Sequence, residues 1–471
     1  MPSADPPPLA VCVDFGSTFT KALLVDVSDG ASDGDERGTV VASAEHPTTI
    51  GTDVLDGFDA CLTALVAADP RAADAPVLAC SSAGGGLRIA VVGNEELVTA
   101  EAGRRVALSS GGKVVEVVAV AGRVPDADLF LALEHTSRPD VVLLTGGTDG
   151  GNGEALLAAA RGLAGARWAG PVVVAGNADV ADEVAALLAA ADVPHVVADN
   201  VVPRIGVLAP TAARAAIREV FLAHVIGGKH LSRRDGGAAF TAMVRGATPD
   251  VVLTGVELLA EEVGEVVVVD VGGATTDVHS VVELDPETGE LARDVVAPTP
   301  VTRTVEGDLG MRWSAVSTVA EAGLPELEPA AVVRRDEPGW LPATDTDLDD
   351  DEAIARAAVG LALRRHAGRS KVVVSPEGRV VERTGVDLRE VDLLVGSGGV
   401  LRHGRAGVAD RVLATSVGHH GDWQLPERAR VVVDNAYVLA AVGLLAGEHP
   451  AAARALVRSL LPHDARARVT T

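Results

Sequence analysis

The sequence has little cysteine and few aromatic residues. Its three cysteines, Cys12, Cys61 and Cys80, form no CxxC pair and have no metal-ligand spacing, which indicates free thiols in a reducing compartment. We therefore expect a cytoplasmic protein. Aromatic residues make up only 2% of the chain, so its core must be built from aliphatic side chains.

Long hydrophobic runs and excess positive charge are also absent. No unbroken apolar run approaches the ~18 residues of a membrane-spanning helix, so we expect no membrane partner. The N-terminal stretch has no basic region and no apolar core, and residues 1–8 are interpreted as a disordered proline-rich tail. Acidic residues outnumber basic ones by 66 to 40, which disfavours a nucleic-acid partner. With 471 residues, the chain has room for two or more domains.

One segment, VVVVDVGGATTDVHSVV from Val266 to Val282, predicts a strand, a tight turn and a second strand. Glycines in the turn let backbone N–H groups approach an anion, and threonine hydroxyls add donors. The turn residues expected to contact phosphate are Gly272, Gly273, Thr275 and Thr276. Asp270 and Asp277 bracket the turn with carboxylates, an arrangement suited to a hydrated Mg²⁺ beside phosphates. A purely structural hairpin with a Gly-Gly turn would give a similar pattern and remains the alternative.

A second hairpin of the same kind is predicted near the N-terminus. The strand Leu9 to Phe15 runs into a short turn, and another strand follows from Ala22 to Val27. Asp14 lies at the end of the first strand, and Lys21 supplies a movable positive charge. The turn residues expected at a phosphate are Gly16, Ser17, Thr18 and Thr20. Two phosphate hairpins thus lie far apart in the sequence.

Between them, residues 140–208 alternate strands with helices, which predicts a parallel sheet with crossover helices. Asp and Asn residues follow the strands, where open α/β sheets place ligands. These residues are Asp149, Asn152, Asn177, Asp199 and Asn200. A second ligand site and simple capping of the following helices are equally compatible with this pattern.

The C-terminal part contains another buried strand, Val391 to Val395, that ends in glycines. The glycines of this segment let a flat ring lie against the backbone; the segment is Gly396, Ser397, Gly398 and Gly399. Arg402 is available to stack on that ring or to contact phosphate. Upstream, the acidic stretch that ends at Asp351 predicts an exposed connection before a helix from Glu352 to His366. Its spacing does not fit a calcium loop.

These motifs resemble the superfamily of actin, the sugar kinases and the seventy-kilodalton heat-shock chaperones. The spacing Asp14-x-Gly16-Ser17-x-x-x-Lys21 is similar to the first phosphate loop of actin, and Asp270-x-Gly272-Gly273-x-Thr275-x-Asp277 to the second loop of the chaperones. VGSGGVLR, residues 395–402, looks like their adenosine motif. The resemblance implies an α/β, actin-like ATPase fold with two RNase H-like halves around a cleft that binds Mg-ATP.

More specifically, the chain resembles the MutL (GlmL) family associated with adenosylcobalamin-dependent glutamate mutase. The segments VDFGSTFTKALLVD, LTGGTDGGN, ADNVVPRIG, DVGGATTDVHS and VGSGGVLR carry this likeness. It implies half I over residues 9–247, with an α/β insertion at about 79–225, and half II over 248–471. It also implies an accessory or reactivating chaperone whose partners are the mutase subunits.

For the site, the resemblance implies ATP bound across both hairpins, with Mg²⁺ held through Asp14 and Asp270. Lys21 and the glycine amides would neutralise charge on the transferred phosphoryl group. Asp270 is the expected base for water, with Asp277 and Glu257 behind it. ATP hydrolysis is therefore a possibility that the sequence leaves open.

Two other functions share these loops. A small-molecule kinase of the sugar or acetate kinase type needs a polar acceptor pocket, which the 140–208 region offers room for. A filament-forming actin-like ATPase is the third candidate. Asp277-x-His279 is superficially similar to the cobalamin motif D-x-H-x-x-G, but Val282 stands where the glycine belongs, so we expect no cobalamin to bind this chain directly.

Overall fold

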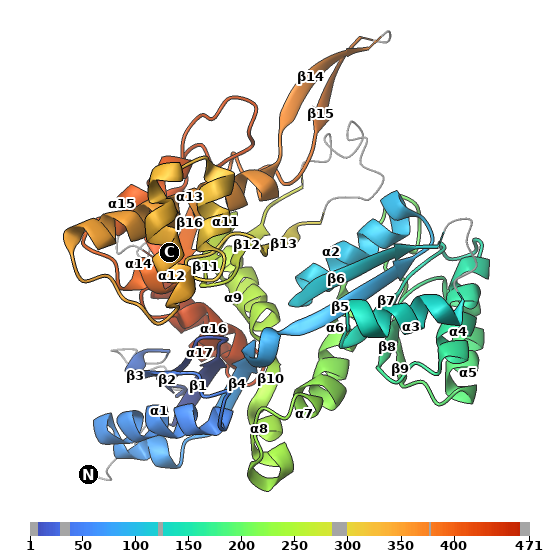
Figure 1. The fold of residues 1–471 in the computed structure, drawn as a ribbon, viewed down its shortest axis with the longest axis horizontal. Helices are drawn as coiled ribbons and strands as arrows, with labels where there is room; N and C mark the ends of the chain where they lie inside the picture. Colours follow the sequence, from blue (N-terminus) through green and yellow to red (C-terminus); the bar gives the residue numbers. More distant parts are fainter. Residues whose placement is uncertain (1–7, 29–37, 121–125, 285–298, 376–377, 462–471) are drawn as a thin grey trace.

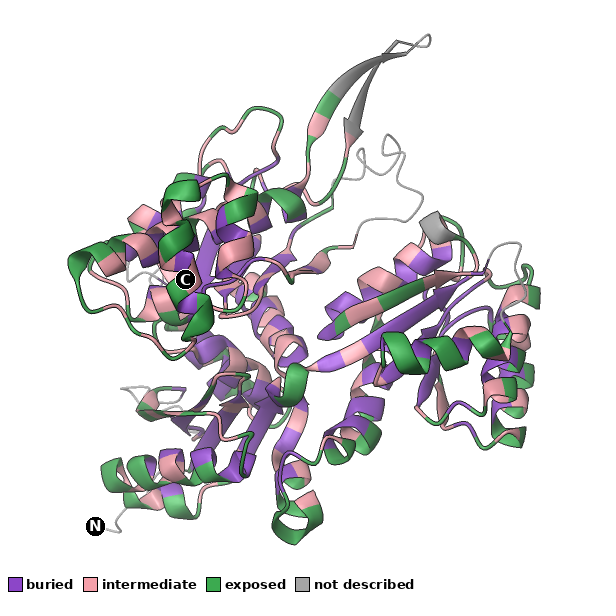
Figure 2. Cartoon of the chain, viewed as in Figure 1, coloured by how far each residue is buried: buried purple, intermediate pink, exposed green. Residues whose placement is uncertain are grey.

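The computed structural model describes residues 8–28, 38–120, 126–284, 299–375 and 378–461. Within these residues it contains three five-stranded sheets and a two-stranded ribbon (Figure 1). The strand centres are buried, and the exposed residues lie mainly on the outer helices (Figure 2). The predicted fold class, α/β with two related halves and an α/β insertion, is confirmed.

The first half is built on a mixed sheet with the order β10-β4-β1-β2-β3. The antiparallel part is a meander, and β4 and β10 continue it in parallel with β1. Helix α1 begins after Asp53, whose carboxylate accepts from the Leu55 N–H, and it packs on β2 and β3. The bounds are β1 (Leu9–Phe15), β2 (Phe19–Asp26), β3 (Val40–Pro47), β4 (Val77–Ser81), β10 (Val244–Ala247) and α1 (Val54–Ala68).

The second half repeats this topology. Its sheet has the order β13-β12-β11-β16-β17, again with an antiparallel meander followed by two parallel strands. The central strand of each half is almost entirely buried, in keeping with its run of aliphatic residues. The bounds are β11 (Val266–Val271), β12 (Thr276–Val281), β13 (Val301–Glu306), β16 (Leu393–Ser397) and β17 (Arg430–Val433).

An all-parallel sheet is inserted between β4 and β10, as the strand and helix alternation predicts. Its order is β6-β5-β7-β8-β9, and helices cover it on both sides (Figure 1). The strands are β5 (Leu87–Gly93), β6 (Gly112–Ala119), β7 (Val141–Leu144), β8 (Val172–Val174) and β9 (His195–Val197). The helices are α2 (Glu101–Ser109), α3 (Ala127–Thr136), α4 (Glu154–Ala166), α5 (Ala181–Ala190) and α6 (Thr211–Val220). Two short helices, α7 (Ile226–Gly228) and α8 (Ala238–Met243), lead back to β10.

Three helices join the two halves: α9 (Thr248–Val263), α16 (Val438–Leu445) and α17 (Pro450–Arg458). A Cβ added at Gly255 on α9 would lie 2.3 Å from the Leu439 carbonyl oxygen, and one at Gly443 on α16 would lie 1.9 Å from that of Val251. Only glycine permits backbones this close. Their apolar side chains form one core with the inner faces of β1 and β11, so both halves share buried surface.

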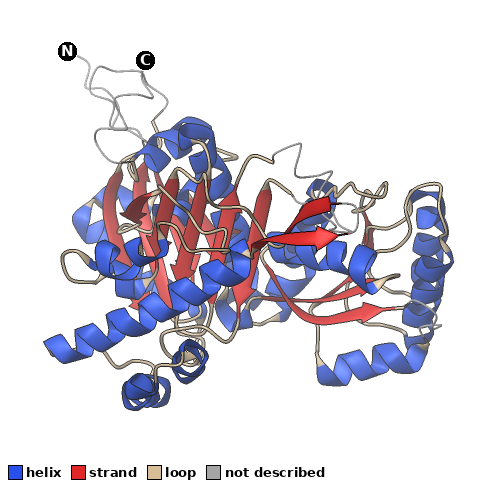
Figure 3. Cartoon of the chain, turned by 90° about the horizontal axis from the view of Figure 1, so that it is seen from above, coloured by secondary structure: helices blue, strands red, loops and turns tan. Residues whose placement is uncertain are grey.

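The remaining helices belong to the second half. They are α11 (Ala315–Ala322), α12 (Glu328–Asp336), α13 (Asp345–Ala367), α14 (Gly399–Arg402) and α15 (Val408–Val412). The long α13 is prominent when the molecule is viewed from above (Figure 3). It begins at Asp345, seven residues earlier than expected, because a capping box between Thr344 and Asp347 starts it and carboxylates are favourable near a helix N-terminus. The ribbon of β14 (Ser370–Ser375) and β15 (Gly378–Arg383) follows.

Among the described residues, no helix is both long and apolar enough to cross a membrane.

Candidate nucleotide site

The two predicted hairpins have equivalent turns. In the first, the Gly16 N–H donates to the Phe19 carbonyl at 3.1 Å; in the second, the Gly272 N–H donates to the Thr275 carbonyl at 2.9 Å. A Cβ at Gly16 would lie 2.6 Å from that Phe19 oxygen, and one at Gly272 would lie 2.9 Å from the Thr275 oxygen. Both turns therefore need glycine, and both end a strand that carries an aspartate.

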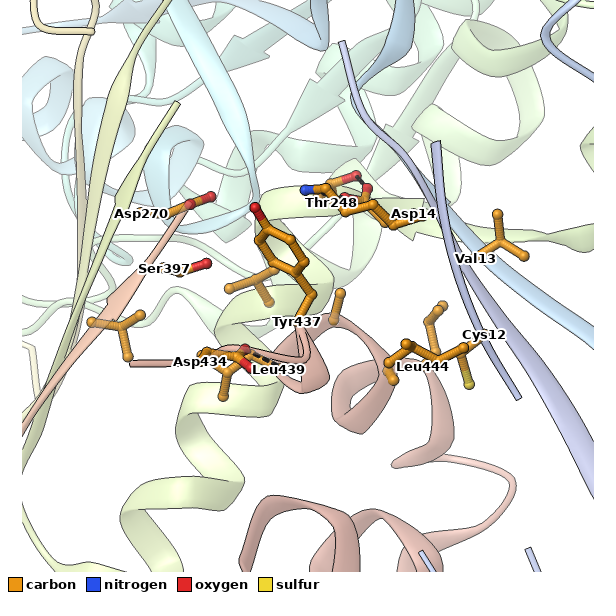
Figure 4. A pocket seen from close by; sticks show the side chains of 16 residues that line it. Cys12, Val13, Asp14, Thr248, Asp270, Ser397, Asp434, Tyr437, Leu439 and Leu444 are labelled. Atoms are coloured by element: carbon orange, nitrogen blue, oxygen red, sulfur yellow. Dashed lines mark hydrogen bonds and ion pairs between the residues drawn. The ribbon is translucent and has the colours of Figure 1, made fainter. Parts of the chain in front are cut away.

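The ends of these strands meet at a cavity of about 50 Å³ between the halves. Figure 4 shows Asp270 and Ser397 on one side of the Tyr437 ring, and Asp14 with Thr248 on the other. The cavity also contacts aliphatic side chains of α9 and α16. Its polar lining consists of Asp14, Lys21, Thr248, Asp270, Ser397, Asp434 and Tyr437. Four of these residues, Asp14, Lys21, Asp270 and Ser397, are ones that the sequence predicted at a nucleotide.

Asp14 is held by partners from three elements. The Thr248 hydroxyl at the start of α9 donates to Asp14 Oδ1 at 2.6 Å, and the Cys80 thiol lies 3.6 Å from the same oxygen. Lys21 Nζ is 3.8 Å from Asp14 Oδ2, because Lys21 is the residue opposite Asp14 in the β1–β2 register. One carboxylate oxygen therefore faces a cation, and the other accepts a hydroxyl hydrogen bond.

Asp270 lies in a different electrostatic environment. Burial raises the pKa of its carboxyl to about 6, with nearby Asp277 and Asp14 acting in the same direction. Lys21 and a hydrogen bond from Ser397 act to lower that pKa. A carboxylate with a pKa this close to neutral is a better proton acceptor than an exposed aspartate.

Tyr437 fills the space between the cations of the two halves. Lys21 Nζ lies 3.7 Å from the centre of its ring, and the Arg402 guanidinium lies 4.7 Å from it. Tyr437 precedes α16 with a φ of 53°, a left-handed conformation that costs an ordinary residue energy. Burial acts to lower the pKa of Lys21, but Asp14, Tyr437 and Asp270 raise it overall, so Lys21 is a stable cation.

Arg402 and His403 of half II both contact Glu45 of half I. Arg402 on α14 donates to Glu45 on β3 at 3.0 Å, and His403 lies 3.6 Å from the other oxygen of Glu45. These contacts join half II to half I. We call this arrangement, with its small cavity and these contacts across the halves, the closed form.

Asp277 does not line the cavity. Its Oδ1 accepts from Arg303 at 3.1 Å (Nε) and 2.5 Å (Nη2), and its Oδ2 accepts from the Thr275 hydroxyl at 3.3 Å. The Nη1 of the same arginine donates to the carbonyls of Leu108, at 2.8 Å, and Gly112, at 3.2 Å. Arg303 therefore ties the second hairpin to the insertion.

The other predicted site residues are not part of the cavity lining. Ser17 and Thr18 are on the first turn, Gly273 and Thr275 on the second, and Gly399 begins α14. Thr20 and Thr276 are fully buried; the Thr20 hydroxyl pairs with that of Thr48, and the Thr276 hydroxyl donates to the Leu309 carbonyl. Gly396 packs on Leu413, while Gly398, with a φ of 111°, lies against the Val271 carbonyl. Several of these residues therefore fix the conformation of the loops through contacts with the rest of the protein, and do not face the cavity.

Three polar residues of the lining were not predicted: Thr248, Asp434 and Tyr437. Asp434 is buried and caps α16 by accepting from the Val438 N–H at 2.9 Å and the Leu439 N–H at 3.2 Å. Burial raises the pKa of this carboxyl. An aspartate just before an apolar helix is an N-cap signal that sequence reading can detect.

The Asp and Asn residues of the insertion bond mainly to one another and to their own loops. Asp149 Oδ1 accepts from the Ala178 N–H at 3.0 Å and from the Asn200 amide at 2.8 Å. Asn177 accepts from the Asp179 N–H at 2.9 Å, and its amide donates to the Gly151 carbonyl at 3.0 Å. Of the two interpretations of this pattern, the structure favours capping and loop closure.

Comparisons with known proteins identify the family. The chain matches the family model described as MutL protein over residues 10–461. It is 33% identical to the protein named Protein MutL from Clostridium tetanomorphum, over 95% of this chain and 98% of the relative.

Solved structures with a similar arrangement have low sequence identity. They include the ethanolamine utilization protein EutJ from Carboxydothermus hydrogenoformans, at 10% identity and a TM-score of 0.31, covering 93% of this chain and 89% of that one. A xylulose kinase from Lactobacillus acidophilus gives 11% identity and a TM-score of 0.33, covering 98% and 96%. No functional conclusion is drawn from these structural likenesses. The family match over residues 10–461 and the 33% identical relative show that the chain belongs to the MutL protein family.

Proposed function

We propose that this chain binds Mg-ATP in the cleft between its halves and hydrolyses it, as an accessory chaperone for an adenosylcobalamin-dependent mutase such as glutamate mutase. The observation that carries the proposal is the convergence of Asp14, Lys21 and Asp270 on one cavity from two equivalent hairpins. Membership of the MutL family supports the choice of client.

The donor set fits the cofactors. Mg²⁺ prefers oxygen ligands, keeps several waters, and is usually bound by one or two carboxylates together with phosphate oxygens. Asp14 and Asp270 are those carboxylates in our proposal. The glycines from Gly396 to Gly399, with Arg402, would hold the adenosine. When bound, the metal supplies charge neutralisation at the phosphates.

Each residue then has a distinct role. Lys21 neutralises negative charge on the phosphoryl group, and it remains charged because its pKa is raised. Asp270 accepts a proton from the attacking water. Asp277 is paired with Arg303 and Glu257 with Arg214, and both lie outside the cavity lining, which favours Asp270 as the base over the two alternatives.

Nucleotide entry requires the closed form to open. A cavity of about 50 Å³ holds only a few waters, whereas pockets for organic ligands measure roughly 300–1,000 Å³. Opening separates Arg402 from Glu45 and moves Tyr437 away from Lys21. We propose that this motion, driven by binding and hydrolysis, is passed to the mutase so that damaged cobalamin leaves.

The chain itself is not proposed to bind cobalamin. His279 is buried in β12, and burial holds the pKa of its imidazole well below the usual value. It is not presented to a large ligand. The three cysteines are buried free thiols, in keeping with the cytoplasmic location we propose.

The deciding experiment measures ATP turnover by the purified protein, with and without cobalamin-inactivated glutamate mutase. We expect ADP formation stimulated by the mutase, together with recovery of mutase activity. Asp270→Ala should lose both, while Asp74→Ala, at an exposed position, should keep both.

Normal nucleotide binding with neither effect would overturn the chaperone assignment. Small-molecule phosphoryl acceptors would then be screened for kinase activity, and ATP-dependent pelleting would test for filaments.

A further inference from the structure

A second cavity, of about 260 Å³, lies where the insertion meets the second half. It is lined by α2 and α6 of the insertion, by α9, and by residues 299–301 at the start of β13. Its polar lining consists of Arg105, Ser109, Thr211, Arg214, Glu257 and Thr299. The cavity is about five times larger than the one at the hairpins, and the proposed nucleotide site does not use it.

Arg214 is the best-fixed cation of this cavity. Its Nη1 donates to Glu257 at 3.0 Å, and its Nη2 lies 3.6 Å from the buried Asp250, which also accepts from Arg218 at 2.5 Å. Its Nε, however, is buried without a hydrogen-bond partner among the described residues. Buried donors are almost always satisfied, so this N–H calls for an acceptor that the described residues do not supply.

The hydroxyl groups of Ser109 and Thr299 are acceptors that lack a donor within the described part of the chain. Ser109 donates to the Val106 carbonyl at 3.0 Å, and Thr299 donates to the Val301 carbonyl at 2.9 Å. Their protons are committed, so their lone pairs remain to accept from a donor. Val106, Leu208 and Val301 provide an apolar wall beside them. A matching ligand combines an acidic oxygen, a hydrogen-bond donor and a short aliphatic body.

We propose that this cavity binds a small carboxylic acid that carries a hydroxyl or amino group, with its carboxylate on Arg214 Nε. A carboxylate is favoured over phosphate because Glu257 and Asp250 already face the same guanidinium, and a doubly charged anion would be repelled more strongly. Arg105, which is paired with Glu101 at 3.0 Å, adds positive charge to the wall.

The position of the cavity links a bound ligand to the second hairpin. Helix α2, which provides Arg105 and Ser109, ends beside Arg303, which donates to the Leu108 carbonyl and to Asp277 of the second hairpin. A ligand that joins α2 to residues 299–301 therefore stabilises the contact between the insertion and the second hairpin. This part rests on the proposed function: the acid and the nucleotide should change each other's affinity by the same factor.

The first test uses the full chain without nucleotide, so its result is independent of the nucleotide site. Succinate, malate and aspartate are titrated in separate calorimetric experiments. We expect one-site binding of malate if the site prefers a hydroxyl donor, or of aspartate if it prefers an amino donor. Succinate, which has neither donor, should bind at least tenfold more weakly.

Two variants separate binding from folding. Arg214→Gln should lose at least tenfold in affinity, and Leu208→Trp, which fills the cavity without touching an ion pair, should lose binding with an unchanged melting temperature. Arg161→Gln, at an exposed position on α4, is the matched control and should bind normally. Absence of saturable binding by all three acids, or unchanged binding in both cavity variants, would overturn the proposal.

Discussion

The two phosphate hairpins have the same backbone and opposite electrostatics. In the first, the aspartate at the strand end lies opposite a lysine, in the pair Asp14 and Lys21. In the second, the equivalent aspartate lies opposite another aspartate, in the pair Asp270 and Asp277. The turns close with the same backbone hydrogen bond, so the difference comes from one position on the second strand.

The residue at this position, Lys21 or Asp277, gives the two hairpins different charges. The first hairpin carries a balanced pair that positions a carboxylate and supplies a cation. The second concentrates negative charge: Asp277 acts with burial to raise the pKa of Asp270, against the opposing effect of Lys21, and Arg303 balances Asp277. A repeated fold can therefore produce two unequal halves of one site, with the proposed proton acceptor on the second.

The strongest way to break the comparison is to neutralise the carboxylate of the second hairpin. Asp270→Asn should lower ATP turnover by about 10²–10⁴-fold, the range expected when a general base is removed. Folding should be retained, since the raised pKa means that the charged form is disfavoured in the folded protein. Steady-state ADP release checks the rate, and Asp74→Asn is the control. A rate within threefold of the parent would exclude Asp270 as the base.

Removing the balancing cation tests the charge on Asp277. Arg303 is only 5% exposed, so Arg303→Gln leaves a mostly buried carboxylate unpaired and should lower the free energy of unfolding by about 3 kcal/mol. Adding Asp277→Asn should restore part of that loss, because the unpaired charge is gone. Urea denaturation of the single and double variants measures the coupling. Additive effects would show that the pair is not a unit.

The aromatic ring between the hairpins provides a smaller effect. Tyr437→Gly removes the ring from the cavity and relieves the left-handed backbone, so nucleotide should bind up to about tenfold more tightly. Tyr437→Phe keeps the ring and should bind like the parent.

Tyr437 is the single tyrosine of the chain, so 3-fluorotyrosine labelling gives one ¹⁹F signal. That signal should shift when ATP is added. A nucleotide-saturated protein with an unmoved signal would contradict displacement of the ring.

The smallest expected effect concerns pH. Because the pKa of Asp270 is raised to about 6, its carboxyl is protonated below that value, and turnover should rise as the pH increases through about 6. Lys21 lowers this pKa, so Lys21→Gln should move the rise to higher pH as well as reduce the rate. Rate profiles between pH 5 and 8 measure both; a rise that stays in place would show that Lys21 and Asp270 are not coupled.

Local sequence patterns predicted much of this arrangement. The run of aliphatic residues from Leu9 predicted β1 with its observed bounds, and the Asp-x-Gly spacing identified both turns. The resemblance to the actin superfamily assigned Asp14 and Asp270 to one site, and the structure brings them to one cavity. Such features depend on a few neighbouring residues, which is why they are readable.

Features that depend on distant contacts were not predicted. Nothing local marks Tyr437 as the residue between Lys21 and Arg402, or Arg303 as the partner of Asp277. The ribbon of β14 and β15 was also missed, although valines on either side of the sequence Pro-Glu-Gly are a hairpin signal. The early start of α13 shows that a capping box outweighs the apparent loop character of an acidic run.

The glycine contacts between α9 and α16 also bear on how the molecule folds. Because the inner faces of both sheets bury side chains in one core with these helices, neither half presents a finished surface when the other is missing. Cutting the chain at residue 247 would expose that core on both fragments. The molecule should therefore melt in a single cooperative transition shared by its halves, and the proposed cleft motion would be a bending about a common centre instead of the separation of two independent bodies.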